Sequence, residues 1–106
     1  MSKPRIRLPE QTKSGEVIEI KTLISHVMET GQRKQSDGKP IPRQIINSFS
    51  AKFAGTEVFK ADLHPGISAN PYIAFHMRVP GPGEFEFTWV DVSGAKVVEK
   101  QKLNVV

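Results

Sequence analysis

The chain has 106 residues, of which 25% are charged and 38% hydrophobic, with a formal net charge of +4 and no cysteine. The length fits a single domain, 1–106, and the composition excludes an intrinsically disordered chain. The lack of cysteine excludes disulfides, thiolate metal sites and a cysteine nucleophile, and no apolar run approaches the roughly 20 residues of a membrane span.

Hydrophobic and polar residues alternate along most of the chain with the period of two that is typical of β-strands. A short strand is expected near 5–8, followed by strands over 16–28, 43–53, 57–63, 73–79, 84–92 and 95–106. Glycine and proline turns separate these runs, and no segment has a helical period. The pattern predicts an all-β chain that forms an antiparallel β-sandwich of six or seven strands.

The large aromatic side chains share one parity along their strands, which predicts that they fill the core between the two sheets. These residues are Phe49, Phe53, Phe85, Phe87 and Trp89. Several aliphatic residues have the opposite parity, and a patch of them on one sheet would mark an interface. This second set is Ile46, Val90, Val92 and Val98, with Leu23 and Val27 on an earlier strand.

Residues for catalysis or metal binding are sparse. His26, His64 and His76 are far apart and lack the spacing of metal ligands, so we expect no metal, no cofactor and no catalytic residue. The basic residues are scattered, with one denser group around Arg33 and Arg43, and only Tyr72 among the aromatics is expected at the surface. Nucleic acid is therefore not the expected partner. A small basic nucleic-acid-binding or other adaptor domain remains the alternative.

Three stretches together resemble the SoxZ family, the Z subunits of the sulfur-oxidising carrier complex. They are LISHVMETGQRKQSDGKPIPRQIINSF at 23–49, ISANPYIAFHMRV at 67–79 and GEFEFTWVDVSG at 83–94. The resemblance implies an immunoglobulin-like sandwich that is not an enzyme and forms a heterodimer with SoxY. It further implies that SoxY carries sulfur intermediates covalently on a cysteine in a C-terminal arm, which visits a haem-containing enzyme, a hydrolase and often a dehydrogenase.

The residues and the resemblance lead to different expectations of where the protein is located. The first residues contain no hydrophobic signal core, which alone favours the cytoplasm. The resemblance implies a periplasmic subunit that is exported together with a signal-bearing partner. The chain ends KLNVV without a Gly-Gly-Cys arm, so it resembles the Z subunit and not the carrier.

Two regions are expected to bind SoxY or the enzymes that the carrier visits. The first is the outer face of the third, sixth and seventh strands, with Ile46, Val90, Val92 and Val98. The second combines the long segment 29–43, with Arg33 and Arg43, and the strand entry at Asn70 and Tyr72. Asn70 precedes a proline that favours an extended entry, so this turn would present Tyr72 in a fixed position. A purely structural role in starting the strand is equally compatible with that turn.

Overall fold

The computed structural model describes residues 4–24, 38, 45–63 and 71–106, and these ranges contain seven β-strands. The strands are β1 (Arg5–Arg7), β2 (Val17–Leu23), β3 (Ile46–Phe53), β4 (Thr56–Asp62), β5 (Tyr72–Arg78), β6 (Gly83–Asp91) and β7 (Lys96–Leu103). Within the described ranges, no helix has the length and hydropathy needed to cross a membrane.

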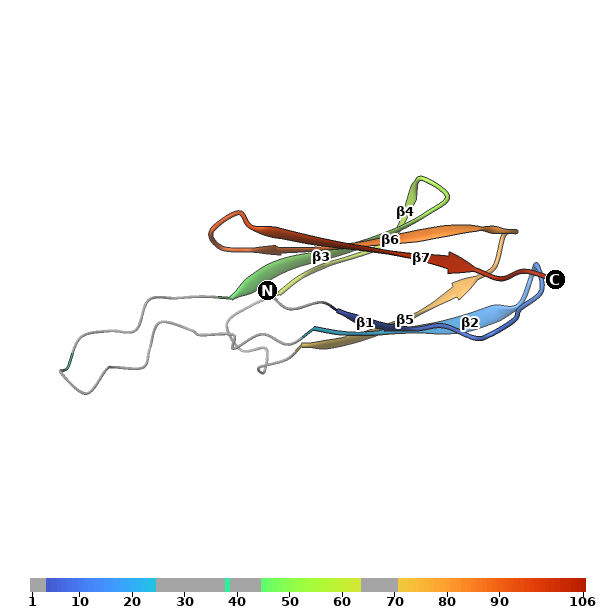
Figure 1. Cartoon of the computed structure of the whole chain (residues 1–106), viewed down its shortest axis with the longest axis horizontal. Helices are drawn as coiled ribbons and strands as arrows, with labels where there is room; N and C mark the ends of the chain where they lie inside the picture. Colours follow the sequence, from blue (N-terminus) through green and yellow to red (C-terminus); the bar gives the residue numbers. More distant parts are fainter. Residues whose placement is uncertain (1–3, 25–37, 39–44, 64–70) are drawn as a thin grey trace.

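The strands form two antiparallel sheets that lie one above the other as layers (Figure 1). One sheet has the order β1-β2-β5 and the other has the order β4-β3-β6-β7. The predicted all-β, immunoglobulin-like sandwich is therefore confirmed, and the third, sixth and seventh strands are neighbours as expected. The fourth strand joins the sheet of the third strand, where the constant-type immunoglobulin order would place it in the other sheet.

An aromatic cluster fills the space between the layers. Trp89 and Phe49 stack with ring centroids 5.0 Å apart and an interplanar angle of 7°. Phe75 comes from the three-stranded sheet and stacks on Phe59 of the four-stranded sheet, with centroids 4.6 Å apart. The five aromatic residues predicted to point inward are all buried. These ring contacts hold the two layers together, because each ring buries a large apolar surface.

The predicted position of Ile46 is wrong. Its side chain is 0% exposed and belongs to the core, not to the outer face. The pairing of β3 with β6 shifts register between Ile46 and Ser48, and Asn47 is exposed while Ile46 is buried. A β-bulge of this kind inserts one residue and reverses the alternation of side chains on its far side. An aspartate at this position would therefore test the core and not an interface.

Asp91 organises the turn between β6 and β7. Its Oδ1 accepts hydrogen bonds from the backbone N–H of Ser93 at 2.9 Å and of Ala95 at 3.0 Å, and also from the Ser93 hydroxyl. Asp91 is only 8% exposed, whereas the residues that donate to its carboxylate are exposed.

We expect Asp91→Ala to lower the free energy of unfolding by about 1–3 kcal/mol, because it leaves these donors without their acceptor. Asp62→Ala is the control, since Asp62 is an exposed carboxylate at the end of β4. Urea denaturation of both variants measures the difference. Equal losses in the two variants would show that the turn does not depend on this acceptor.

Candidate partner-binding surfaces

The outer face of the four-stranded sheet carries an uncharged strip. The strip crosses the two central strands, β3 and β6, and the edge strand β7. In the strand register, Val90 lies beside Ser48 on one side and Lys96 on the other. Thr88 in turn lies between Ser50 and Val98. We call Ser48, Ser50, Thr88, Val90 and Val98 the central strip. Its side chains are small, so a partner could approach the sheet closely here.

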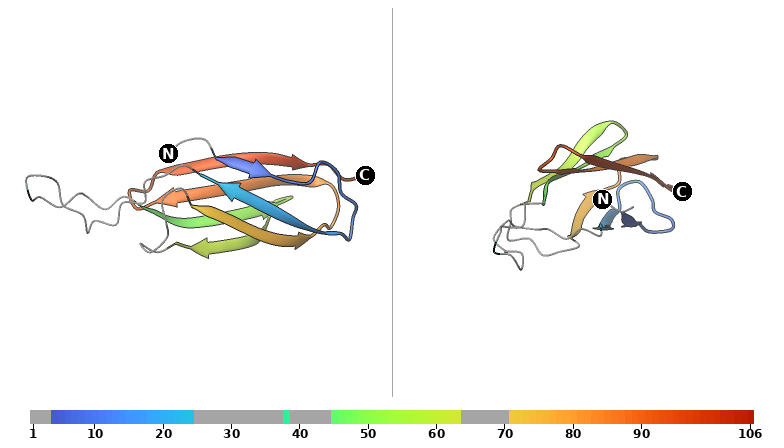
Figure 2. Two further views of the ribbon diagram at one scale, coloured as in Figure 1. Left: turned by 90° about the horizontal axis from the view of Figure 1, so that it is seen from below. Right: turned by 60° about the vertical axis from the view of Figure 1, so that its left-hand side comes forward.

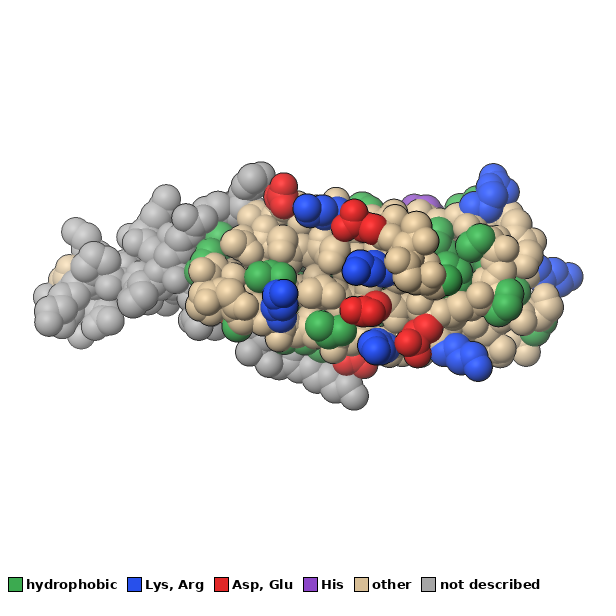
Figure 3. All heavy atoms as spheres, turned by 90° about the horizontal axis from the view of Figure 1, so that it is seen from above, with side chains coloured by type: hydrophobic (Ala, Val, Ile, Leu, Met, Phe, Trp, Pro, Cys, Tyr) green, Lys and Arg blue, Asp and Glu red, His purple; other side chains and the backbone are tan. Residues whose placement is uncertain are grey.

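A row of alternating charges runs beside the central strip. Lys52 lies opposite Glu57 on β4 and Glu86 on β6, and Glu86 lies opposite Lys100 on β7. Figure 3 shows acidic and basic side chains alternating across the middle of this face, with hydrophobic side chains beside them. Such exposed cross-strand pairs each contribute little to stability. They do fix a charge pattern that a partner surface would have to match.

The predicted exposure of two valines on this side is confirmed. Val98 is 48% exposed and Val92, in the turn after β6, is 41% exposed, while Val90 is half-buried. With Ile46 in the core, the apolar part of this face is smaller than predicted. The role of the three valines in binding a partner remains a prediction.

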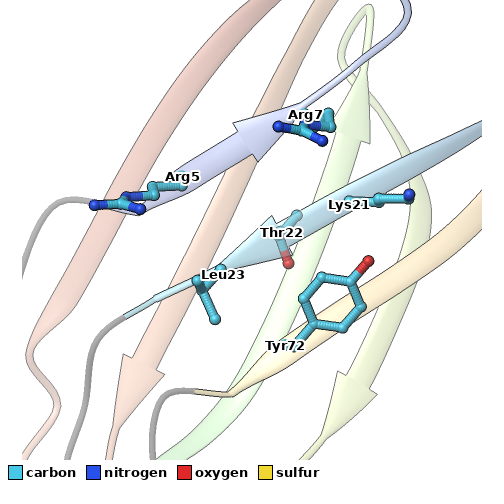
Figure 4. A pocket seen from close by; sticks show the side chains of 6 residues that line it. All are labelled: Arg5, Arg7, Lys21, Thr22, Leu23 and Tyr72. Atoms are coloured by element: carbon cyan, nitrogen blue, oxygen red, sulfur yellow. The ribbon is translucent and has the colours of Figure 1, made fainter.

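The outer face of the three-stranded sheet contains a hollow of about 310 Å³. Figure 2 shows this sheet from below, with β1 and β5 at its two edges and β2 between them. The register places Arg5, Leu23 and Tyr72 in one row across the three strands. Arg7 and Lys21 face each other in the next row. These five side chains and Thr22 line the hollow (Figure 4).

The cations of the hollow differ in their ion pairing. Lys21 Nζ lies 3.3 Å from Glu19 Oε1, and the other oxygen of Glu19 lies 3.7 Å from His76 Nε2. Among the described residues, neither Arg5 nor Arg7 has a carboxylate within ion-pair distance. Thr22 is buried and satisfied, since its hydroxyl donates to the Ile73 carbonyl oxygen at 2.9 Å. The two arginines therefore leave the hollow positively charged.

The structure describes only some of the residues that the sequence singled out. Tyr72 is 58% exposed, which confirms its predicted display. His76 is also exposed, as expected, and the described residues contain no group of three or more potential metal ligands. Arg33, Arg43, Asn70, His26 and His64 lie outside the described residues, as does Val27.

Sequence reasoning missed Arg5, Arg7 and Lys21 because it treated them as scattered charge. They are up to 16 positions apart in the chain, and only the pairing of β1 with β2 brings them together. The available signal was the alternation of Arg5 and Arg7 in a short strand, which places both on one face. Nothing local in the sequence says which residues of the neighbouring strand face them.

Comparisons with known proteins bear on the family and on the fold. A family model described as "Sulphur oxidation protein SoxZ" matches residues 6–102. None of the curated proteins matches the chain. Superoxide reductase (neelaredoxin) from Ignicoccus hospitalis has a similar structure, with a TM-score of 0.73 and 14% identity over 99% of this chain and 81% of that one. The sulfur carrier protein SoxY from Chlorobium limicola f thiosulfatophilum also has a similar structure, with a TM-score of 0.68 and 15% identity over 97% of this chain and 78% of that one. At these identities, the two structures show a shared fold alone.

Proposed function

Because the chain belongs to the SoxZ family, we propose that it is the non-catalytic subunit of a SoxYZ carrier complex in sulfur oxidation. In this complex it pairs with SoxY, whose C-terminal cysteine carries the covalently bound sulfur intermediates of thiosulfate oxidation. The family match over residues 6–102 is the observation that carries the proposal. The complex works in the periplasm, which this subunit reaches by export together with its signal-bearing partner.

The chemistry of the residues supports a division of labour between two chains. The 106 residues contain no cysteine, so they offer no thiol to which a sulfur intermediate could be bound. They also offer no thiol that could trap the carrier cysteine of a partner as a mixed disulfide. A subunit of this kind can hold and present the carrier without competing for its cargo.

The central strip is the surface that we propose for pairing with SoxY. Its uncharged side chains would form the desolvated centre of an interface, and the row of alternating charges beside it would set the register. A stable interface covers about 800 Å² on each partner, so it has to extend from the strip over the charged row. The haem-containing, hydrolase and dehydrogenase enzymes of the system then dock transiently on the surface that the pair leaves open.

Co-purification tests the proposal directly. The chain is expressed with an affinity tag in its host, and the proteins that it retains are identified by mass and quantified. We expect one small protein with a Gly-Gly-Cys terminus in equal molar amount, recovered from the periplasmic fraction. Recovery of nucleic acid without such a protein would favour the alternative of a basic nucleic-acid-binding domain. Recovery of the pair from the cytoplasm alone would contradict the proposed location.

A further inference from the structure

We propose that the cationic hollow on the three-stranded sheet binds an extended acidic segment of a partner protein. Carboxylates of the segment would bind Arg5, Arg7 and Lys21, and one of its apolar or aromatic side chains would pack on Leu23 and Tyr72. The hollow and the central strip lie on opposite outer faces of the sandwich. The inference therefore does not depend on the pairing with SoxY, and both partners could bind at once.

The spacing of the cations matches an extended chain. Arg5 and Arg7 are alternate residues on one face of β1, so their Cα atoms are about 6.6–6.8 Å apart. Lys21 lies directly opposite Arg7 on the neighbouring strand, and the Cα atoms of such a pair are about 5 Å apart. Alternate side chains of an extended peptide have the same repeat, so carboxylates two positions apart could reach Arg5 and Arg7 together.

The electrostatics of the hollow favour carboxylates. Arg5 and Arg7 are exposed and have no acidic partner among the described residues, so binding an anion does not require breaking an existing ion pair. Guanidinium groups bind carboxylates through two parallel hydrogen bonds, which are stronger than bonds between neutral groups. Lys21 contributes less, because Glu19 at 3.3 Å already neutralises part of its charge.

The shape and the lining of the hollow favour part of a polypeptide over a whole small ligand. Its volume of about 310 Å³ is at the lower end of the range of small-molecule pockets. Figure 4 shows the Tyr72 ring lying across the open face of the sheet, with Leu23 next to it. Tyr72 lies across β2 from the two arginines, and tyrosine and arginine are both enriched where protein surfaces bind one another.

Binding of a synthetic peptide to the isolated full chain tests the proposal. The probe is a short fluorescein-labelled peptide with two glutamates two positions apart and a phenylalanine two positions further on, so that all three side chains share one face of the extended chain. Its partner probe has glutamine in place of glutamate. Fluorescence anisotropy should show binding of the glutamate peptide that weakens as salt is added. The double variant Arg5→Gln with Arg7→Gln should weaken this binding roughly tenfold or more. Tyr72→Ala should weaken it severalfold.

A matched control separates the hollow from the overall basic charge. Lys100→Gln with Lys102→Gln removes the same charge from exposed positions on β7, in the other sheet, and should leave peptide binding unchanged. Equal weakening in the two double variants would overturn the proposal, as would equal binding of the glutamine peptide. Tighter binding of inorganic sulfate or of a thymidine oligonucleotide than of the peptide, lost in the same double arginine variant, would also overturn the proposal. Thermal melting of each variant verifies that the exposed substitutions leave the fold intact.

Discussion

Replacing Trp89 with alanine should lower the free energy of unfolding by roughly 3–5 kcal/mol, which is the usual cost of removing a large core aromatic. The Trp89 side chain is 0% exposed and stacks on Phe49, with ring centroids 5.0 Å apart. Its ring also packs against that of Phe87, with centroids 6.3 Å apart. Its loss would leave a cavity under the centre of the four-stranded sheet. Urea denaturation followed by circular dichroism measures the effect, and stability within a few tenths of a kcal/mol of wild type would contradict the packing described above.

Trp89→Phe separates the packing contribution from the polar group of the same residue. The indole Nε1 is buried and has no hydrogen-bond acceptor among the described residues. A buried donor without an acceptor costs about 1–3 kcal/mol, so its removal offsets part of the lost volume. We therefore expect Trp89→Phe to be much less destabilising than Trp89→Ala. Equal losses would mean that the phenyl ring recovers none of the packing that the indole provides.

The strands could be predicted from the sequence because their signal is local. Alternation of polar and apolar residues depends only on neighbours in the chain, and the strand expected over 57–63 is observed as β4, Thr56–Asp62. The inward orientation of Phe85, Phe87 and Trp89 follows from the same parity. Ile46 was misplaced because a bulge depends on how β3 pairs with β6, and parity alone does not reveal an inserted residue.

The candidate sites were less predictable than the fold, since they depend on pairings between distant residues. Tyr72 could be predicted as exposed because it starts a strand after a proline. The hollow could not be predicted, because it requires Arg7 to lie opposite Lys21 and Leu23 to lie opposite Tyr72. The role of Gly83 could not be predicted either, since its place in a Pro-Gly run predicts a turn. In the structure it starts β6, and an added Cβ would meet the Phe53 ring at 2.8 Å.

Val98→Asp should weaken the pairing with SoxY by roughly thirtyfold while leaving the subunit folded, if the central strip is the centre of that interface. Val98 is 48% exposed, so water can solvate a carboxylate there in the free chain. Pairing would remove that water, and a desolvated charge without a matched partner is costly. Isothermal titration of the variant with purified SoxY measures the affinity, and its melting temperature verifies the fold.

Two further variants decide what the result means. Val98→Lys introduces the opposite charge between Lys96 and Lys100, so it should also weaken pairing if desolvation is the cause. If the aspartate weakens pairing and the lysine does not, charge complementarity with an acidic partner explains the result better than desolvation. Val17→Asp makes the same change at a valine that is 56% exposed on the other sheet, and it should leave pairing unchanged. Weakening by Val17→Asp alone would move the SoxY interface to the face that carries the hollow. SoxY and the acidic segment would then compete for one surface, and the labelled peptide would be displaced when SoxY is added.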